Sequence, residues 1–213
     1  MLRTTEGMER LARSHDRERE HCDVVAIAAS AGGLAALSVV LSEFETDLPA
    51  AVLVVQHMDP AHPSHLAEIM SRRVTIRVKQ AEDGERPVNG TVYIAVPNRH
   101  LLLNPDGRLS LTDTPASHFV RPAADLLFQS VAKSCGARSM VVVLSGSGTD
   151  GAEGAVAVKA AGGTVIVQNE DTAEFFSMPR AAIETGSVDQ ILPLSGIAKE
   201  VVRFFEELKE HAG

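Results

Sequence analysis

The sequence predicts an α/β fold: a doubly wound, mainly parallel sheet with helices on both faces and an antiparallel hairpin insertion. From Val24 onward, short apolar runs rich in β-branched residues alternate with segments of helical periodicity, which is typical of βαβ units around a parallel sheet. The runs are apolar along their whole length, as expected of strands that helices cover on both faces. With 213 residues, of which 45% are hydrophobic, the chain is long enough to bury a substantial core.

The parallel part of the sheet is predicted from the apolar runs, and the helices from the segments between and after them. The predicted strands are Val24–Ala29, Ala51–Val55, Met140–Leu144 and Thr164–Val167. The predicted helices are Leu34–Phe44, Ser64–Arg72, Ala123–Cys135, Ala152–Ala161, Pro179–Thr185 and Ile197–Glu210. A helix lies between each pair of successive strands, so the strands are predicted to be joined as βαβ units.

The segment between residues 75 and 112 follows a different pattern. Its runs "TIRVKQ", "TVYIAV", "HLLL" and "RLSLT" are short and partly alternating, and the turn sequences "EDGE" and "NPDG" lie between them. These features predict antiparallel hairpins that are inserted into the parallel sheet or added at its edge. Residues 1–22 mix charges of both signs with few apolar side chains. We expect them to form a charged N-terminal tail, which leaves one domain over residues 23–213.

Composition and charge argue against several classes of function. The formal net charge is −8 and the basic residues are scattered, whereas a nucleic-acid-binding surface needs clustered lysine and arginine. No apolar run approaches the roughly 18 residues of a membrane span, and the N-terminus is charged where a signal peptide is apolar. The two cysteines imply no disulfide framework. We therefore expect a cytoplasmic protein that neither binds nucleic acid nor inserts into a membrane.

Three polar side chains come soon after predicted parallel strands. Ser30 follows the first strand in "ASAGG", His57 follows the second in "QHMDP", and Asp150 lies in "SGSGTDG" after the third. Ligands of open parallel sheets bind beyond the carboxyl ends of the strands, so we expect these side chains to meet there. A hydroxyl, an imidazole and a carboxylate are the nucleophile, the general base and the orienting acid of a serine hydrolase. Small residues around Ser30 permit a tight turn, and the N–H groups of the following helix would favour an oxyanion.

Each of these residues also has other interpretations. Ser30 and Asp150 are suitable N-caps for the helices that follow them, and His57 is suitable as a hydrogen-bonded core histidine. The loop "SGSGTDGAEG" is compatible with phosphate binding, although it lacks the Lys-Ser/Thr ending of a Walker loop. Metal binding is a further alternative, although the spacing in "HMDPAHPSH" matches no standard helical zinc pair. Its candidate ligands are His57, Asp59, His62 and His65.

The order and spacing of seven motifs resemble the catalytic domain of the CheB-type chemotaxis protein-glutamate methylesterases. The motifs are "ASAGG", "QHM", "AEDGE", "YIA", "RPAAD", "LSGSGTDG" and "QNE" followed by "MPR". The resemblance covers about residues 24–194 and implies a Ser-His-Asp triad on a doubly wound sheet. It assigns Ser30 as nucleophile, His57 as base, Asp150 as orienting acid and the backbone N–H of Ser147 as oxyanion donor. It implies no metal and no organic cofactor.

The same resemblance implies an activity and a partner. Enzymes of this type hydrolyse methyl esters of glutamate side chains on chemoreceptors, and some also deamidate receptor glutamines, so the expected partner is a methylated receptor-like protein. Ala31 stands where a threonine commonly follows the nucleophile, which bears on oxyanion support. Such esterases usually carry an N-terminal receiver domain, but only 23 residues precede the first predicted strand. We therefore expect a stand-alone catalytic domain with no receiver domain in the chain. The alternative from another class is a non-catalytic binding or regulatory module that retains the esterase fold.

Overall fold

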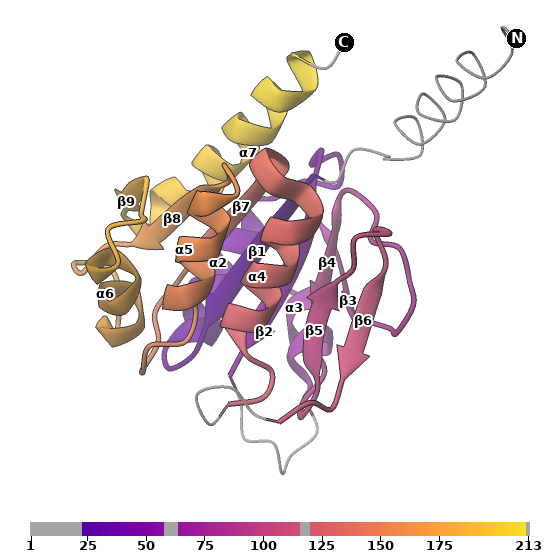
Figure 1. The fold of residues 1–213 in the computed structure, drawn as a ribbon, viewed down its shortest axis with the longest axis horizontal. Helices are drawn as coiled ribbons and strands as arrows, with labels where there is room; N and C mark the ends of the chain where they lie inside the picture. The colour runs from indigo at the N-terminus through magenta and orange to yellow at the C-terminus, as the bar shows by residue number, and fades with distance from the viewer. Residues whose placement is uncertain (1–22, 58–63, 116–119, 212–213) are drawn as a thin grey trace, which may run out of the picture.

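A seven-stranded sheet with the order β3-β4-β2-β1-β7-β8-β9 forms the centre of the protein, and every neighbouring pair of its strands is parallel. The computed structural model describes residues 23–57, 64–115 and 120–211. The strands of this sheet are β1 (Val24–Ala29), β2 (Ala51–Gln56), β3 (Arg77–Gln80), β4 (Thr91–Ile94), β7 (Ser139–Val143), β8 (Thr164–Gln168) and β9 (Gln190–Leu192). The described chain starts at β1 in the middle, places β2, β4 and β3 on one side, and then places β7, β8 and β9 on the other (Figure 1). The predicted doubly wound arrangement is therefore confirmed.

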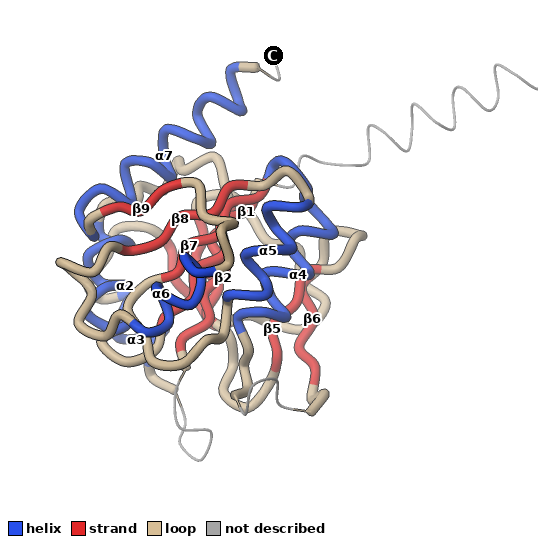
Figure 2. Tube along the Cα trace, turned by 60° about the vertical axis from the view of Figure 1, so that its left-hand side comes forward, coloured by secondary structure: helices blue, strands red, loops and turns tan. Residues whose placement is uncertain are grey.

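Helices cover both faces of the sheet (Figure 1, Figure 2). The helices of one face are α4 (Ala124–Cys135), α5 (Ala152–Ala160) and α6 (Ser177–Glu184), and those of the other are α2 (Gly33–Ser42), α3 (Leu66–Ser71) and α7 (Leu194–Glu210). Alternate residues of β1 belong to the two cores: Ala26 and Ala28 face the first group of helices, whereas Ile27 and Ala29 face the second. Because both faces of β1 are buried, the strand is apolar throughout.

The segment 75–112 contains one antiparallel hairpin. β5 (His100–Leu103) and β6 (Leu109–Thr112) pair antiparallel, as predicted. They form a separate two-stranded sheet, however, and not the predicted part or edge of the parallel sheet. The prediction is wrong for "TIRVKQ" and "TVYIAV", because the strands β3 and β4 within them are parallel and extend the main sheet at its edge. The "EDGE" turn between them bonds to β6 instead of closing a hairpin, since the N–H of Gly84 donates to the carbonyl oxygen of Leu109 (2.9 Å).

The other predicted elements agree with the structure to within a few residues. The strand predicted at residues 24–29 is β1 without change, and the helix predicted at 123–135 is α4, which begins one residue later. The strand β9 is absent from the prediction because it has only three residues and lies at the edge of the sheet. One expectation about the cysteines changes: Cys135, at the end of α4, is disulfide-bonded.

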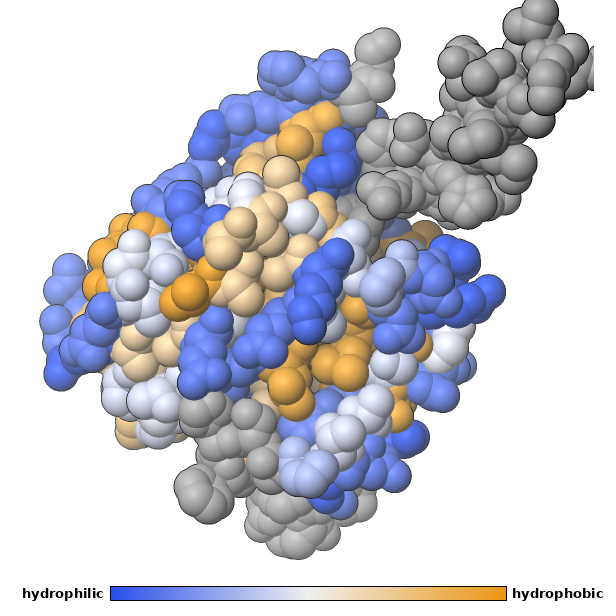
Figure 3. Space-filling view, in the orientation of Figure 1, coloured by the Kyte–Doolittle hydropathy of each residue, from blue (hydrophilic) through white to orange (hydrophobic). Residues whose placement is uncertain are grey.

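The surface mixes polar and apolar side chains. On the face drawn in Figure 3, hydrophilic residues alternate with smaller hydrophobic areas. Among the described residues, the exposed large apolar side chains are spread over helices, a strand and loops and are Leu34, Val39, Ile69, Val88, Val156, Phe175 and Ile191. Within the ranges that the structure describes, none of the helices combines the length and the apolar character that crossing a membrane requires.

Candidate active site

The ends of β1, β2 and β7 bring Ser30, His57 and the loop that contains Asp150 to one edge of the sheet. The register of β1 and β2 makes Ser30 and His57 the next residues along two neighbouring parallel strands. The N–H of Ser30 donates to the carbonyl oxygen of Ser145 (3.0 Å), and the N–H of His57 donates to that of Ala29 (3.0 Å). Backbone hydrogen bonds therefore continue past the strand ends and fix both residues relative to the loop after β7.

Ser30 lies on a tight turn that requires glycine at two following positions. Gly32 has φ 73°, in the left-handed region. A Cβ on Gly33 would lie 2.2 Å from Oε1 of Gln56 and 2.7 Å from Cβ of Ala29, so no larger residue fits there. The helix α2 begins at Gly33, and its N-cap Gly32 has no side-chain capping bond. The hydroxyl of Ser30 is therefore not the N-cap of α2.

Gln56, the last residue of β2, joins the ends of both strands. Its side chain is 8% exposed, and its Nε2 donates to the carbonyl oxygens of Ser30 (2.8 Å) and His57 (3.0 Å). One side-chain amide thus fixes the backbone of the residue with the hydroxyl and of the residue with the imidazole. Sequence reasoning assigned Gln56 no role. The signal that identifies it is a polar side chain at the end of an otherwise apolar strand, because such a group must be hydrogen-bonded when buried.

His57 and Asp150 form a direct contact, with 2.7 Å between Nε2 of the imidazole and Oδ2 of the carboxylate. Asp150 is 3% exposed. Its Oδ2 also accepts the N–H of Ala124 (2.6 Å), and its Oδ1 accepts the N–H of Asp125 (2.9 Å). Burial alone would raise the pKa of Asp150, but the hydrogen bonds from His57 and from these backbone N–H groups outweigh it and hold the pKa below its ordinary value. An ionised Asp150 keeps a proton on Nε2 of His57 and leaves Nδ1 as the basic ring nitrogen.

The glycine-rich loop after β7 approaches Ser30 closely. A Cβ on Gly146 would lie 2.9 Å from Cβ of Ser30 and 2.8 Å from Sδ of Met178. The N–H of Gly146 donates to the carbonyl oxygen of Phe175 (2.9 Å), whereas no hydrogen bond among the described residues uses the N–H of Ser147. Ser147 is exposed, and its N–H is the predicted oxyanion donor.

A buried histidine fixes the start of α4, whose first N–H groups bind Asp150. His100 is 0% exposed; its Nδ1 accepts the N–H of Ala123 (3.1 Å), and its Nε2 lies 3.2 Å from the carbonyl oxygen of Pro115. Burial lowers the pKa of His100, so the ring is neutral, with the proton on Nε2 directed at the carbonyl. Neither His100 nor Gln56 is among the residues that the sequence pattern identified.

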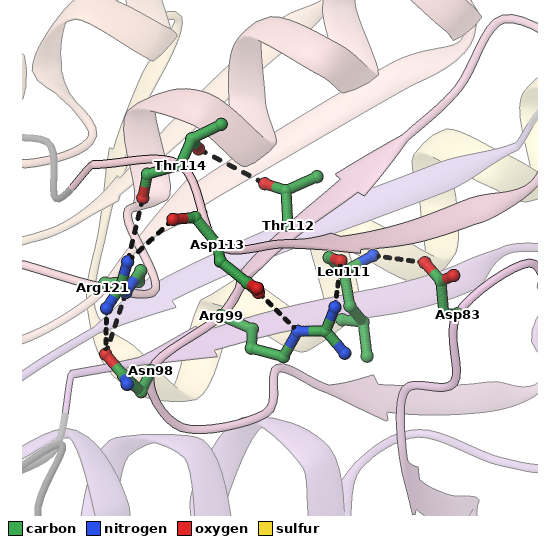
Figure 4. A network of polar contacts seen from close by, with 8 residues as sticks. All are labelled: Asp83, Asn98, Arg99, Leu111, Thr112, Asp113, Thr114 and Arg121. Carbon is green, nitrogen blue, oxygen red and sulfur yellow. Dashed lines mark hydrogen bonds and ion pairs between the residues drawn. The ribbon is translucent and has the colours of Figure 1, made fainter.

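Arg121 connects the start of α4 to the β5–β6 hairpin (Figure 4). Its Nε (2.9 Å) and Nη2 (2.6 Å) donate to Oδ1 of Asn98, and its Nη1 donates to the carbonyl oxygens of Asp113 (3.0 Å) and Thr114 (3.1 Å). Arg99, at the entry to β5, is joined in turn to the carboxylate of Asp113. The residues just before and just after the hairpin are therefore fastened to the residues just before α4.

The described residues contain no hydrogen bond between the Ser30 hydroxyl and His57, although both lie at the same strand edge.

Two of the candidate metal ligands, Asp59 and His62, lie outside the described residues. A third, His65, is exposed, and its Nδ1 lies 3.5 Å from Oε2 of Glu68. No group of three or more His, Cys, Asp or Glu side chains within the described ranges could hold a metal ion.

The fold and the groups at its strand ends define a class: doubly wound α/β proteins that carry a hydroxyl, an imidazole and a buried carboxylate where such sheets bind their ligands. The family model described as CheB methylesterase matches residues 25–201. The chain belongs to this family.

Curated relatives and a solved structure show the same similarity. The chain is 43% identical over 183 residues to the Bdellovibrio bacteriovorus protein named protein-glutamate methylesterase/protein-glutamine glutaminase, a match that covers 84% of this chain and 51% of the relative. The Pyrococcus abyssi protein of the same name is 40% identical over 188 residues, with 87% and 51% covered. The chain thus spans about half the length of the curated relatives it matches. The crystal structure of the Thermotoga maritima CheB methylesterase catalytic domain matches with a TM-score of 0.82 and 35% identity, covering 85% of this chain and 98% of that one.

Proposed function

We propose that the protein is a serine esterase that hydrolyses methyl esters of glutamate side chains on a protein substrate. The observation that carries the proposal is the 2.7 Å contact between His57 and the buried carboxylate of Asp150, at the edge where Ser30 lies on a glycine-rich turn. The names of the relatives, protein-glutamate methylesterase and protein-glutamine glutaminase, support the ester substrate and extend the proposal to glutamine deamidation. The proposed partner is a methylated receptor-like protein.

In the proposed mechanism Ser30 is the nucleophile and His57 the general base. Because Nε2 of His57 faces Asp150, the ring nitrogen that takes the hydroxyl proton is Nδ1. The Ser30 oxygen attacks the ester carbonyl carbon, and the negative charge of the tetrahedral intermediate falls on the former carbonyl oxygen. The N–H of Ser147 donates to that oxygen, since no other acceptor among the described residues uses it.

The intermediate then collapses with cleavage of the bond to the methoxy group. His57 returns its proton to the departing oxygen, so methanol leaves and the glutamyl group remains on Ser30 as an ester. Water repeats the sequence: His57 takes a proton from water, the hydroxide adds to the acyl carbon, and the Ser30 oxygen leaves with the proton. Asp150 keeps its negative charge throughout and stabilises the imidazolium of each step.

The proposal is tested with the purified chain and a peptide that carries a glutamate γ-methyl ester, by measuring released methanol. Ser30→Ala and His57→Ala are each expected to lower kcat by about 10⁴–10⁶-fold, because the members of a triad act as a unit. The matched control is Ser42→Ala, since Ser42 lies at the far end of α2 and its hydroxyl donates to the carbonyl of Val39. A fluorophosphonate probe should label the wild type at Ser30. Full turnover by either Ser30→Ala or His57→Ala contradicts the proposal.

A further inference from the structure

A second buried carboxylate, that of Asp125, lies beside Asp150 and has no part in the proposed mechanism. Asp125 is 1% exposed, and its Oδ1 accepts two backbone N–H groups, from Gly151 (2.9 Å) and Gly154 (2.7 Å). Burial raises the pKa of Asp125 to about 6, and the nearby charge of Asp150 acts in the same direction against the N–H groups of the two glycines. Burying a carboxylate costs free energy unless hydrogen bonds compensate for the lost water, so the hydrogen bonds of Asp125 are what allow it to be buried here.

The two carboxylates cap each other's helices. Asp150 directly precedes Gly151, the N-cap of α5, yet its oxygens accept the first N–H groups of α4, from Ala124 and Asp125. Asp125 lies in the first turn of α4, yet its oxygen accepts the N–H groups of Gly151 and Gly154 at the start of α5. The N-cap residues themselves, Ala123 of α4 and Gly151 of α5, supply no side-chain bond. N–H groups at the start of each helix therefore donate to the acid located at the start of the other helix.

The close approach of α4 and α5 restricts movement of the two capping carboxylates. A Cβ on Gly154 would lie 2.5 Å from Cβ of Phe128 and 3.1 Å from Cα of Asp125, so α5 packs against α4 at a distance that only glycine allows. Asp150 can rotate or shift only if the start of α4 moves, and the start of α4 is bonded through Asp125 to the residue that follows Asp150.

We infer that Asp125 is a positioning residue for the reaction: by binding the N–H groups at the start of α5 it holds the Asp150 carboxylate in the orientation that accepts Nε2–H of His57. The inference rests on the proposed function, because it gives Asp125 a role only through the Asp150–His57 pair. Without the Asp125 side chain, the segment from Asp150 to Gly154 loses two hydrogen bonds to one acceptor, Oδ1. The backbone that carries Asp150, whose carboxylate lies 2.7 Å from His57, is then no longer held by α4 through these bonds.

The test compares two substitutions of Asp125 with a control. Asp125→Ala removes the acceptor, and we expect kcat for the methyl ester to fall about tenfold to a hundredfold with KM nearly unchanged, as for a small displacement of a catalytic group. Asp125→Asn keeps an oxygen at Oδ1 that accepts both N–H groups, and we expect it to retain kcat within about threefold. The control is Asp189→Ala: Oδ2 of Asp189 also accepts a backbone N–H, that of Val165 (2.9 Å), but at the start of β8 and so at the opposite edge of the sheet.

A second readout does not depend on turnover. The proton on Nε2 of His57 gives a downfield proton NMR signal when it is hydrogen-bonded to Asp150, and this signal should weaken or shift in Asp125→Ala but persist in Asp125→Asn and Asp189→Ala. If Asp125→Ala does not fold, Asp125→Glu takes its place, since it displaces the carboxylate by one methylene, and the same loss of kcat and change of signal are expected.

The outcomes separate the inference from the proposed function. A wild type without esterase turnover contradicts the proposed function, and the His57 signal of the variants then still decides whether Asp125 positions Asp150. A wild type that turns over, together with a folded Asp125→Ala or Asp125→Glu variant of unchanged kcat and unchanged His57 signal, overturns the inference.

Discussion

Replacing Asp150 by Asn removes one charge from the site with almost no change in shape. Oδ2 of Asp150 accepts two hydrogen bonds, from His57 and Ala124, whereas Oδ1 accepts one, from Asp125. The asparagine will place its oxygen at the Oδ2 position, because this keeps two of the three bonds. Its NH₂ group then faces the N–H of Asp125, and a buried donor left without an acceptor costs about 1–3 kcal/mol of unfolding free energy.

The loss in rate follows from the charge. The asparagine oxygen still accepts Nε2–H, so His57 keeps the tautomer with a basic Nδ1, but the imidazolium of the transition state has no carboxylate partner. Removing one partner of a buried ion pair costs about 3–5 kcal/mol, which corresponds to a fall of about 10²–10⁴ in kcat. The assay is methanol release from the glutamyl methyl ester peptide, with Asp189→Asn as the control for a carboxylate outside the site. A folded Asp150→Asn variant with kcat within about threefold of the wild type would refute the role given to this charge.

Three further predictions concern the loop, the metal alternative and pH. Gly146→Ala should lower kcat about tenfold or more, because the added Cβ would lie 2.9 Å from Cβ of Ser30 and 2.8 Å from Sδ of Met178 and displace the nucleophile. Unchanged methanol release would show that the loop moves to accommodate the methyl group. Turnover should survive dialysis against EDTA, and a loss that zinc restores would favour the metal hypothesis. The pKa of Asp125 is raised from 3.8 to about 6. The stability that the protonated side chain contributes is therefore fully present below pH 3.8 and is lost as the pH rises through about 6, which lowers the free energy of unfolding by about 3 kcal/mol. Asp125→Asn should remove this loss in urea unfolding measured across that range, whereas Asp150, whose pKa is lowered, contributes with the opposite sign at lower pH.

Much of the parallel sheet could be predicted because its buried strands consist of apolar residues, which are recognisable in the sequence. β1 and β2 are buried along their whole length, so each contains an unbroken apolar run, which in β2 ends just before the buried Gln56. The strand β3 lacks this signal, since its side chains are exposed or half-buried. Its partner β4 is fully buried, but the turn "EDGE" between the two strands suggested a hairpin. That turn instead forms a hydrogen bond with β6. The residues of the turn alone cannot predict this bond, because its partner is distant in the sequence.

The sequence predicts that Ser30 and His57 lie at one edge of the sheet, but not which side chains hold the candidate site residues in place. Ser30 and His57 are each the first residue after a buried strand, so parallel register alone places them side by side. The local sequence around Asp150 fits an N-cap for α5, but the carboxylate turns back to the N–H groups of residues 124 and 125. A sequence shows that an acid precedes a helix and cannot show which helix it caps, because capping is decided by the packing of α4 on α5. The same limit hides Asp125, which the sequence presents only as an acid in the first turn of a helix.

The contacts that hold the start of α4 also give a role to the hairpin that is inserted between α3 and α4. The β5–β6 hairpin lies beside the main sheet and supplies no group to the proposed chemistry, but His100 in β5 accepts the N–H of Ala123, the residue before α4. Arg121, two residues earlier, binds Asn98 before the hairpin and the carbonyl groups of Asp113 and Thr114 after it. The start of α4 is thus held from one side by the hairpin and from the other by α5, and the acid that contacts His57 is bonded to that start. The insertion that interrupts the βαβ pattern is therefore part of the framework that orients the catalytic groups of the proposed esterase.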